Sequence, residues 1–228
     1  PLHSPSAGLA VAGCVAALLW GSSCSLALSL LDKDMLGGEG VASATKLESL
    51  RSNYVAARLD PHYPVLDKGA NGRVAHECIV DPRALKASVG IEVEDITKRL
   101  MDYGFHAPTV SFPVAGTLMI EPTESEPKAE LDRFCDALIA IRDEVRAIEA
   151  GTMDRDDNPL KHAPHTLRAV VSDVWEHAYG RELAAVPTES TRQRRLWPSV
   201  ARVESASGDR NPVCSCLTSD AYVPACAE

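Results

Sequence analysis

The sequence predicts an α/β chain whose best-defined part is an α+β unit, with helices packed on a mainly antiparallel sheet. Two observations support this class. Between residues 65 and 150, short apolar runs alternate with stretches of helical periodicity, in the order strand, helix, helix, strand, strand, helix. In addition, 45% of the residues are hydrophobic and 24% are charged, a composition that allows a packed core.

The first helix of this region is predicted over residues 41–59. The run GGEG at 37–40 precedes it, and DPHYP at 60–64 stops it. Helical spacing places one set of side chains on a shared face, with Val55 and Leu59 beside it. That set is Leu47, Leu50, Tyr54 and Arg58.

Two short strands and a helix follow. Val65-Leu66 forms the first strand, and residues 73–81 form the second, with Val74, Cys78 and Val80 on one side. His76 and Glu77 then point to opposite faces of that strand. Pro82 opens a helix that Gly90 closes.

The second half of the unit contains two helices and a pair of strands. Residues 92–104 form a helix with Ile96, Leu100 and Met101 as its apolar positions, and Gly104 ends it. Strands over 109–114 and 116–122 are separated by Ala115-Gly116. The longest helix spans 126–150, with Thr123 or Ser125 as its cap, Glu126 completing a capping box and Pro127 in its first turn. Its expected buried stripe is Leu131, Phe134, Cys135, Leu138, Ile141, Val145 and Ile148.

Charge and cysteine content restrict the class of protein. The net charge of −9 argues against a nucleic-acid binder. Seven cysteines at irregular spacing indicate reduced, partly buried thiols rather than a disulfide framework. Cys214 and Cys216 form the one close pair, but no second pair completes a zinc set, so no metal site is expected. Residues 8–31 are apolar enough to raise membrane insertion as an alternative, although glycines interrupt them and no basic flank precedes them.

Several long stretches resemble one enzyme family. GRVAHECIVD, ITKRLMDYGFHAPTVSFPVAGTLMIEPTESE and ELDRFCDALIAIRDEVRAIEAG are similar to glycine decarboxylase, the P-protein of the glycine cleavage system. The segments NPLKHAPHT, RELAAVP, LWPSVARV and GDRNPVCSC agree with the same family. The first 36 residues match less well. WGSSCSLALSLL resembles a family segment but has Leu19 and Ala27 where prolines are expected.

The resemblance implies the C-terminal part of an aspartate-aminotransferase-like fold that uses pyridoxal phosphate (PLP). Residues 1–40 would be a diverged end of the cofactor-binding large domain, 41–150 the small domain, and 151–228 a wrapping tail. The family decarboxylates glycine and passes the aminomethyl group to the lipoyl arm of H-protein. The lysine that binds the cofactor lies upstream of this sequence in the family, so the chain alone is expected to be inactive. The implied partners are the rest of the P-protein, H-protein, and a second subunit in a homodimer or heterotetramer. The implied location is the bacterial cytoplasm or the mitochondrial matrix.

Candidate site residues follow from this family context. His106 and Thr109 follow a helix-ending glycine and are expected to be catalytic, although His106 could instead bond only backbone in the turn. Ser22 and Ser23 are candidate donors to the cofactor phosphate of a neighbouring subunit. His76 and Glu124 are expected at the substrate cleft.

Structural alternatives stand beside these assignments. Glu124 could serve only in helix capping, and His76 could be ordinary strand polarity. The helix start near residue 126 is expected to favour an anion such as glycine's carboxylate. The basic run Arg192, Arg194 and Arg195 is either a solvated surface or a docking site for an acidic lipoyl carrier.

Three functions remain open at this point. The chain could be the C-terminal portion of an active glycine decarboxylase. It could also be a non-catalytic truncated copy that acts as a binding module or pairs with a full-length subunit. The third alternative is a small protein anchored by residues 8–31.

Overall fold

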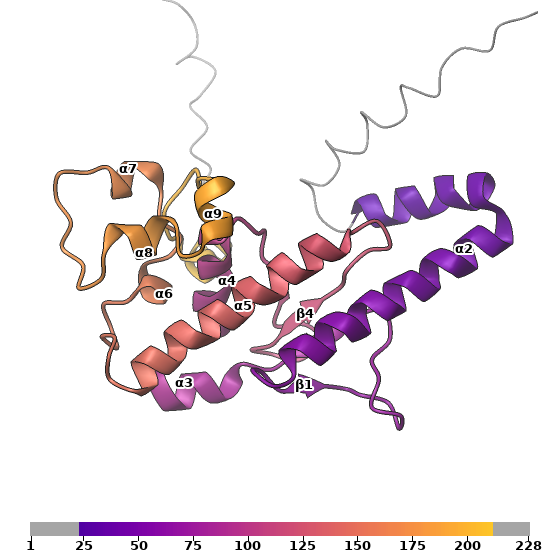
Figure 1. The fold of residues 1–228 in the computed structure, drawn as a ribbon, viewed down its shortest axis with the longest axis horizontal. Coiled ribbons are helices and arrows are strands. Elements are labelled where there is room, and N and C mark those ends of the chain that lie inside the picture. Colours follow the sequence, from indigo (N-terminus) through magenta and orange to yellow (C-terminus); the bar gives the residue numbers. More distant parts are fainter. Residues whose placement is uncertain (1–22, 212–228) are drawn as a thin grey trace, which may run out of the picture. The chain divides into compact units, whose positions relative to one another are not determined.

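The computed structural model describes residues 23–211. The elements in chain order are α2 (Ser23–Leu59), β1 (Val65–Leu66), β2 (Cys78–Val80), α3 (Arg83–Val89), α4 (Val93–Asp102), β3 (Thr109–Val110), β4 (Leu118–Ile120), α5 (Lys128–Glu149), α6 (Pro159–His162), α7 (Leu167–Val170), α8 (Arg181–Ala185), α9 (Glu189–Gln193) and α10 (Ser205–Arg210) (Figure 1). The described part divides into two compact units. Unit 1 contains residues up to 86 and 108–142, and unit 2 contains 87–107 and the residues from 143 onward. The domain boundaries predicted at 40 and 150 remain a prediction.

A small sheet forms the centre of unit 1. Its strand order is β1-β2-β4-β3, and every neighbouring pair is antiparallel, which confirms the predicted sheet type. Register places six side chains on one face, because residues alternate between faces along a strand. Five of them are buried, and Val110 on the edge strand β3 is exposed; the buried ones are Val65, Cys78, Val80, Leu118 and Ile120. On the other face Ile79 is buried, Met119 is half-buried and Thr109 is exposed. The sheet therefore packs chiefly through one face.

The face that α2 buries differs from the predicted one. Leu47 and Leu50 are exposed, whereas Val55 and Leu59 are completely buried, together with Ser52 and Ala56. These four positions follow the spacing i, i+3, i+4, i+7, and the helix packs against β2 (Figure 1). Contact with the sheet determines which of the two candidate faces of α2 is buried. The backbone of α2 also breaks at Gly37, whose φ of 63° is left-handed, within the predicted GGEG interruption.

The second strand is shorter than predicted, because residues 73–77 form a loop. The Asn53 side chain on α2 accepts a hydrogen bond from the Val74 N–H at 3.1 Å and donates one to the Val74 carbonyl at 2.8 Å. These bonds use the groups that a longer strand would need for its ladder. His76 therefore lies in a loop and not in a strand.

The predicted strands around residue 115 are also shorter in the structure. Ser111 has a φ of 57°, which ends β3 after two residues. Gly116 has a φ of 80°, and a Cβ there would lie 3.1 Å from Cγ of Arg83. Gly116 therefore permits both a left-handed turn and a close approach of the backbone to Arg83, which a residue with a Cβ would hinder.

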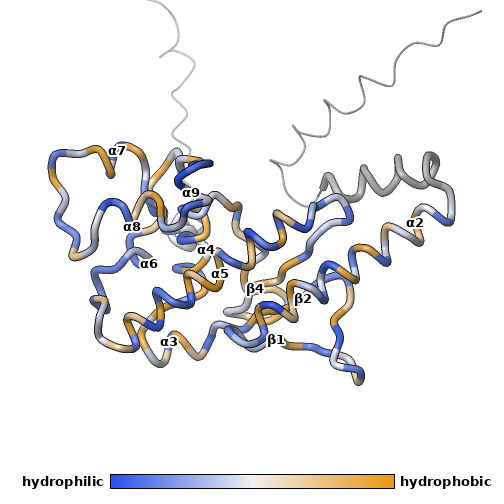
Figure 2. Tube along the Cα trace, viewed as in Figure 1, coloured by the Kyte–Doolittle hydropathy of each residue, from blue (hydrophilic) through white to orange (hydrophobic). Residues whose placement is uncertain are grey.

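The long helix α5 matches its prediction closely. Its stripe is buried at six of the seven predicted positions, and Figure 2 shows hydrophobic and hydrophilic residues alternating along it. The exception is Phe134, which is half-buried. Residues 128–142 of α5 belong to unit 1, where the Tyr63 hydroxyl donates to the Leu138 carbonyl at 2.8 Å.

Unit 2 is built on α4 and the short helices of the tail. Ile96 and Leu100 on α4 are fully buried, as predicted, whereas Met101 is half-buried. A capping box between Glu92 and Asp95 starts this helix. α4 packs against α6, so the residues after Gly151 share a core with α4 rather than forming a separate fold.

Candidate functional site

The two residues predicted to be catalytic belong to different units. His106 lies in the loop after α4, in unit 2, and its side chain is exposed. Thr109 begins β3, which is an edge strand of the sheet in unit 1, and is also exposed. Within residues 23–211, neither side chain makes a hydrogen bond. The alternative in which His106 bonds backbone in the turn is therefore not what the structure has.

The two residues predicted at the substrate cleft do gather in one place. His76 Nε2 lies 3.8 Å from Glu121 Oε1, and Glu124 lies close enough to Glu48 on α2 to raise its pKa. The charges of His76 and Glu121 both act on Glu48. We call these four residues, Glu48, His76, Glu121 and Glu124, the carboxylate cluster. All belong to unit 1. Sequence reasoning missed Glu48, because nothing within α2 distinguishes it from any other surface glutamate.

The electrostatics of the carboxylate cluster favour a cation. Burial raises the pKa of Glu48, and the hydrogen bond with Glu124 and the charge of Glu124 raise it further. Three carboxyl groups beside one histidine leave an excess of negative charge. A cationic ligand would relieve this repulsion, whereas an anion would increase it. The anion expected at the nearby start of α5 is thus opposed by the side chains placed there.

The cap predicted for α5 is wrong, because the helix begins only at Lys128 and the two candidate hydroxyls bond to each other in a turn before it. The Thr123 and Ser125 hydroxyls lie 2.9 Å apart and hydrogen-bond to each other, and Arg51 donates to the Thr123 carbonyl at 2.9 Å. The helix begins at Lys128, directly after Pro127. These bonds attach the turn, and with it Glu124, to α2.

The structure describes only one of the two predicted phosphate donors. Ser22 lies outside the described residues, and Ser23 is the first residue of α2.

Of the close cysteine pair, both Cys214 and Cys216 lie outside the described residues. Of the cysteines with described side chains, Cys78 and Cys135 are buried free thiols, as predicted. Burial raises the pKa of Cys78 to about 12 and that of Cys135 to about 11, so neither is a nucleophile at neutral pH.

Unit 2 contains a buried ionic network that the sequence did not reveal. The Arg99 side chain is fully buried and donates to Glu144 at 2.7 Å and to Asp102 at 3.0 Å. Asp102 in turn accepts from the backbone N–H of His165 at 2.7 Å and pairs with its ring Nδ1 at 2.7 Å. His165 Nε2 lies 2.8 Å from the Tyr179 hydroxyl. A clue was the placement of Arg99 and Asp102 one turn apart on an otherwise amphipathic helix.

This network holds unit 2 together rather than performing chemistry. Burial alone would raise the pKa of Asp102, but the His165 hydrogen bond and the Arg99 charge outweigh burial and lower it. Burial raises the pKa of Tyr179, so its hydroxyl stays protonated. The network joins α4, α5 and the loop after α6 through charges that have no access to water. Its function is to orient those segments.

Two of the three arginines in the basic run near the C-terminus already have partners within unit 2. Arg192 pairs with Glu182 and Glu189. Arg195 donates to the Asp102 backbone carbonyl and to the His165 carbonyl, and its guanidinium lies 4.5 Å from the centre of the Trp197 ring. Neither arginine is therefore a free docking cation, which removes most of the support for carrier docking at this run.

A pocket of about 400 Å³ opens in unit 2. Its lining is mixed in charge, and its two basic groups, Lys161 and Arg202, both pair with Asp95, at 2.7 and 2.5 Å. With its cations already paired, the pocket offers no ready site for a phosphate.

No helix among residues 23–211 is both apolar and long enough to span a bilayer.

Comparison with known proteins identifies the family. Residues 44–165 match the family model described as "Glycine dehydrogenase, C-terminal domain". Proteins named "Glycine dehydrogenase (decarboxylating)" are similar over nearly the whole chain. The one from Nostoc sp. is 59% identical over 210 residues, which is 92% of this chain and 21% of the relative. Those from Synechococcus sp. and Xanthomonas axonopodis pv. citri are 58% and 56% identical over 212 residues, 93% of this chain and 22% of each relative.

The chain thus spans about a fifth of the length of the curated relatives it matches. The family match includes the three long stretches between residues 72 and 151 on which the resemblance was based, and the small antiparallel sheet with its helices agrees with the expected α+β domain. The chain belongs to the glycine dehydrogenase (decarboxylating) family, in the region of its C-terminal domain.

Proposed function

We propose that this chain provides the C-terminal domain of a PLP-dependent glycine decarboxylase. The complete enzyme decarboxylates glycine and passes the aminomethyl group to the lipoyl arm of H-protein. The observation that carries the proposal is the family match over residues 44–165, extended by 59% identity over 92% of the chain. The partners are then the rest of the P-protein and H-protein, in the bacterial cytoplasm or the mitochondrial matrix.

The described residues do not fit PLP by themselves. The cofactor needs a lysine amine that is free to form an imine with its aldehyde. Lys68, Lys128 and Lys161 each lie 2.7 Å from a carboxylate oxygen. Lys46 and Lys86 are exposed on helices, and Lys98 is half-buried on α4. We therefore assign the covalent site to the rest of the enzyme, and no step through the cofactor is derived for this chain.

The stretch from His106 to Glu126 is proposed as the cleft-facing wall of the domain. β3 is an edge strand, so its outer backbone groups are not used in the sheet. Thr109 and His106 are exposed and free of hydrogen bonds within residues 23–211, which leaves both available to a ligand. His106 would hold or move a proton, and Thr109 would orient the substrate.

The carboxylate cluster is proposed to recognise the positive end of the substrate. Glycine carries an ammonium group, and Glu124, Glu121 and Glu48 supply the negative charge that such a group needs. His76 borders this charge, with Nε2 at 3.8 Å from Glu121 Oε1. This assignment replaces the expectation that the start of α5 binds the substrate carboxylate.

The test uses a complete enzyme that carries this sequence as its C-terminal part, with glycine–bicarbonate exchange as the measurement. His106→Ala and Thr109→Ala should each lower exchange more than about tenfold, which corresponds to roughly 1.4 kcal/mol of transition-state stabilisation. Glu124→Gln should raise KM for glycine more than it lowers kcat, because it removes charge from a binding site.

Matched controls separate these effects from a loss of folding. His62→Gln and Glu176→Gln change the same residue types outside the cluster and should leave exchange unchanged. All variants should melt at the same midpoint. Unchanged exchange in both His106→Ala and Thr109→Ala would leave the 106–126 stretch with a structural role only.

The claim that the covalent site lies elsewhere has its own test. The isolated 228-residue chain is incubated with PLP, reduced with borohydride and mapped by peptide mass. We expect no stable pyridoxyl adduct at any single lysine. A stoichiometric adduct at one lysine would show that the chain holds the cofactor by itself.

The alternative of a non-catalytic binding module has one supporting observation. Unit 2 exposes several large apolar side chains, and a continuous patch of such side chains would mark a surface that another polypeptide covers. They are Leu167, Val171, Val174, Leu196, Val200 and Val203. Co-expression with the remaining four-fifths of a relative such as the Nostoc enzyme distinguishes the two functions. Restored exchange supports the enzyme domain, whereas stable binding without exchange supports the module.

A further inference from the structure

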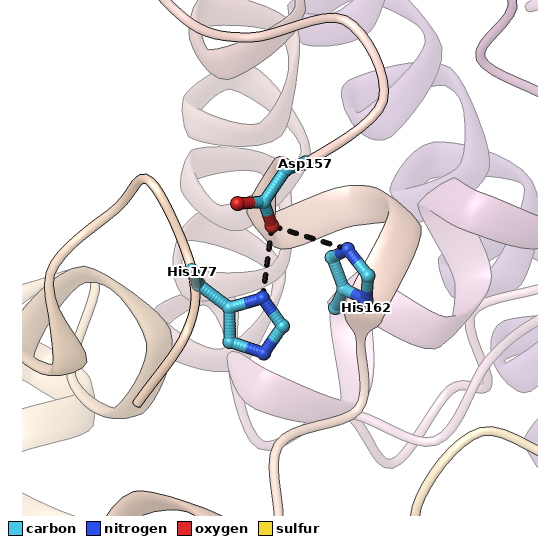
Figure 3. Close-up of side chains that lie close together, drawn as sticks. All are labelled: Asp157, His162 and His177. Carbon is cyan, nitrogen blue, oxygen red and sulfur yellow. Dashed lines mark hydrogen bonds and ion pairs between the residues drawn. The ribbon is translucent and has the colours of Figure 1, made fainter. Parts of the chain in front are cut away.

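Three potential metal ligands converge in unit 2. His177 Nδ1 lies 2.8 Å from Asp157 Oδ1, and His162 Nε2 lies 3.2 Å from the same oxygen. The three ligand atoms all lie within 4.8 Å of one another. Figure 3 shows both rings directed at one carboxylate oxygen. We propose that Asp157, His162 and His177 bind a divalent transition-metal ion of the zinc class.

The ligand types suit such an ion. Zinc takes imidazole nitrogen and carboxylate oxygen at about 2.0–2.2 Å, and three protein ligands leave one position for water. Tetrahedral bonds of that length separate ligand atoms by about 3.3–3.5 Å. The two observed separations from Asp157 are shorter, as expected when His177 is hydrogen-bonded to the carboxylate and no ion separates the groups. A small rotation of partly exposed side chains is enough to admit the ion.

The surrounding backbone holds each ligand in place. The second oxygen of Asp157 accepts the Ala178 N–H at 2.6 Å, which leaves Oδ1 directed at the two rings. The next residue, Asn158, is fully buried and caps α6 by accepting the N–H groups of Leu160 and Lys161. His162 is the last residue of that helix. The cap therefore fixes the distance between Asp157 and His162 along the chain.

His177 is held by aromatic neighbours. Its ring stacks on Tyr179 with centroids 5.0 Å apart and meets the edge of Trp175 at 4.8 Å. The Trp175 indole donates to the Tyr179 carbonyl at 2.7 Å, which closes this loop on itself. Partners of this kind orient a metal-binding imidazole before the metal arrives. Tyr179 itself bonds to His165, so water, not the phenol, would complete the coordination.

Charge at the group agrees with a cation. The Asp157 carboxylate contacts both rings through Oδ1, and Asp154 lies close enough for its charge to act together with that of Asp157. The nearby cation Arg202 is already paired with Asp95 at 2.5 Å.

The alternative is a hydrogen-bonded cluster that needs no ion, and direct binding separates the two. The metal-free full chain is titrated with Co²⁺, whose visible absorption reports nitrogen ligands and coordination number, and then with Zn²⁺ as competitor. We expect one Co²⁺ per chain, displaced by one Zn²⁺, and a melting midpoint raised by either metal. His162→Ala and His177→Ala should each weaken binding at least about tenfold, the lower limit for disturbing even an outer partner of a metal site.

Controls exclude other ligands in the chain. The variant C214S/C216S removes the close cysteine pair and should bind Co²⁺ as tightly as the unchanged chain. His76→Ala removes one imidazole that also lies beside carboxylates, and it should leave Co²⁺ binding unchanged. His162 is 41% exposed, so His162→Gln should fold normally and still lose binding. Absence of stoichiometric Co²⁺ binding, or binding that survives H162Q but is lost in C214S/C216S, overturns the proposal.

Discussion

Removing the charge of Glu144 tests whether the buried ionic network stabilises unit 2. Glu144 accepts hydrogen bonds from Arg99 Nε at 3.0 Å and Nη2 at 2.7 Å, and from the Tyr103 hydroxyl at 2.9 Å. The substitution Glu144→Gln keeps one acceptor oxygen but places an amide donor against the guanidinium. Arg99 is completely buried, so water cannot replace the interaction that its guanidinium loses.

The expected loss of stability depends on the charged partners that Arg99 keeps in the variant. Breaking a buried ion pair by removing one partner costs about 3–5 kcal/mol. Asp102 still pairs with Arg99 at 3.0 Å, so we expect about 3 kcal/mol, the lower end of that range. The matched control is Asp143→Asn on the same helix. Asp143 pairs with Arg146 at the surface, where both side chains are largely exposed, and its loss should cost less than about 1 kcal/mol.

The assay is urea unfolding of the full chain, followed by tryptophan fluorescence. Trp175 and Trp197 lie in unit 2, and a Trp20→Phe background leaves those two as the only tryptophans of the chain. The slope of free energy against urea shows whether the unit still unfolds cooperatively. The double variant R99M/E144Q should be less destabilised than the sum of its single variants, because both charges are then absent. A Glu144→Gln effect no larger than that of Asp143→Asn would refute the argument.

Three further predictions concern packing, backbone and pH. Leu138→Ala should cost about 2–5 kcal/mol in urea unfolding followed by circular dichroism, since Leu138 lies in unit 1, and half-buried Phe134→Ala clearly less; the reverse order would contradict the burial pattern of α5. Gly116→Ala should lower the melting midpoint by an amount equivalent to about 1–2 kcal/mol, because φ is 80° there, whereas an unchanged midpoint would mean that the turn relaxes. Asp102 has a pKa below its ordinary value of 3.8 in the folded state, so its contribution is complete above that value and is lost as pH falls further. Acid unfolding followed by fluorescence should show this loss below about pH 4, and Asp102→Asn should weaken the pH dependence there.

Local periodicity was sufficient wherever one face of an element is much more apolar than the other. It predicted α5 and six of its seven buried positions, together with the buried Ile96 and Leu100 of α4. The antiparallel pairing was also predictable, because turn glycines and prolines separate short apolar runs. Periodicity failed on α2, where Leu47 and Leu50 were as apolar as Val55 and Leu59. Which side faces the sheet depends on the sheet, and that information lies outside the helix.

The candidate sites show the same division. The sequence suggested His76 and Glu124 for one cleft, but Glu48 joins them only because α2 returns to that part of the chain. The partners of Arg99 at Glu144 and Ala184 lie 45 and 85 residues away along the chain. Asp157 and His177, 20 residues apart, come together through a loop without periodicity.

By itself, then, the sequence determined the family, the class of fold and the order of the elements. Each of these depends on residue types at short spacing, which the sequence displays directly. Only the tertiary structure decided which face of α2 is buried and that carboxylates enclose Arg99. It also decided that the rings of His162 and His177 both contact one oxygen of Asp157. The physical reason is that desolvation and charge pairing depend on distances in space, and segments far apart in the chain set those distances.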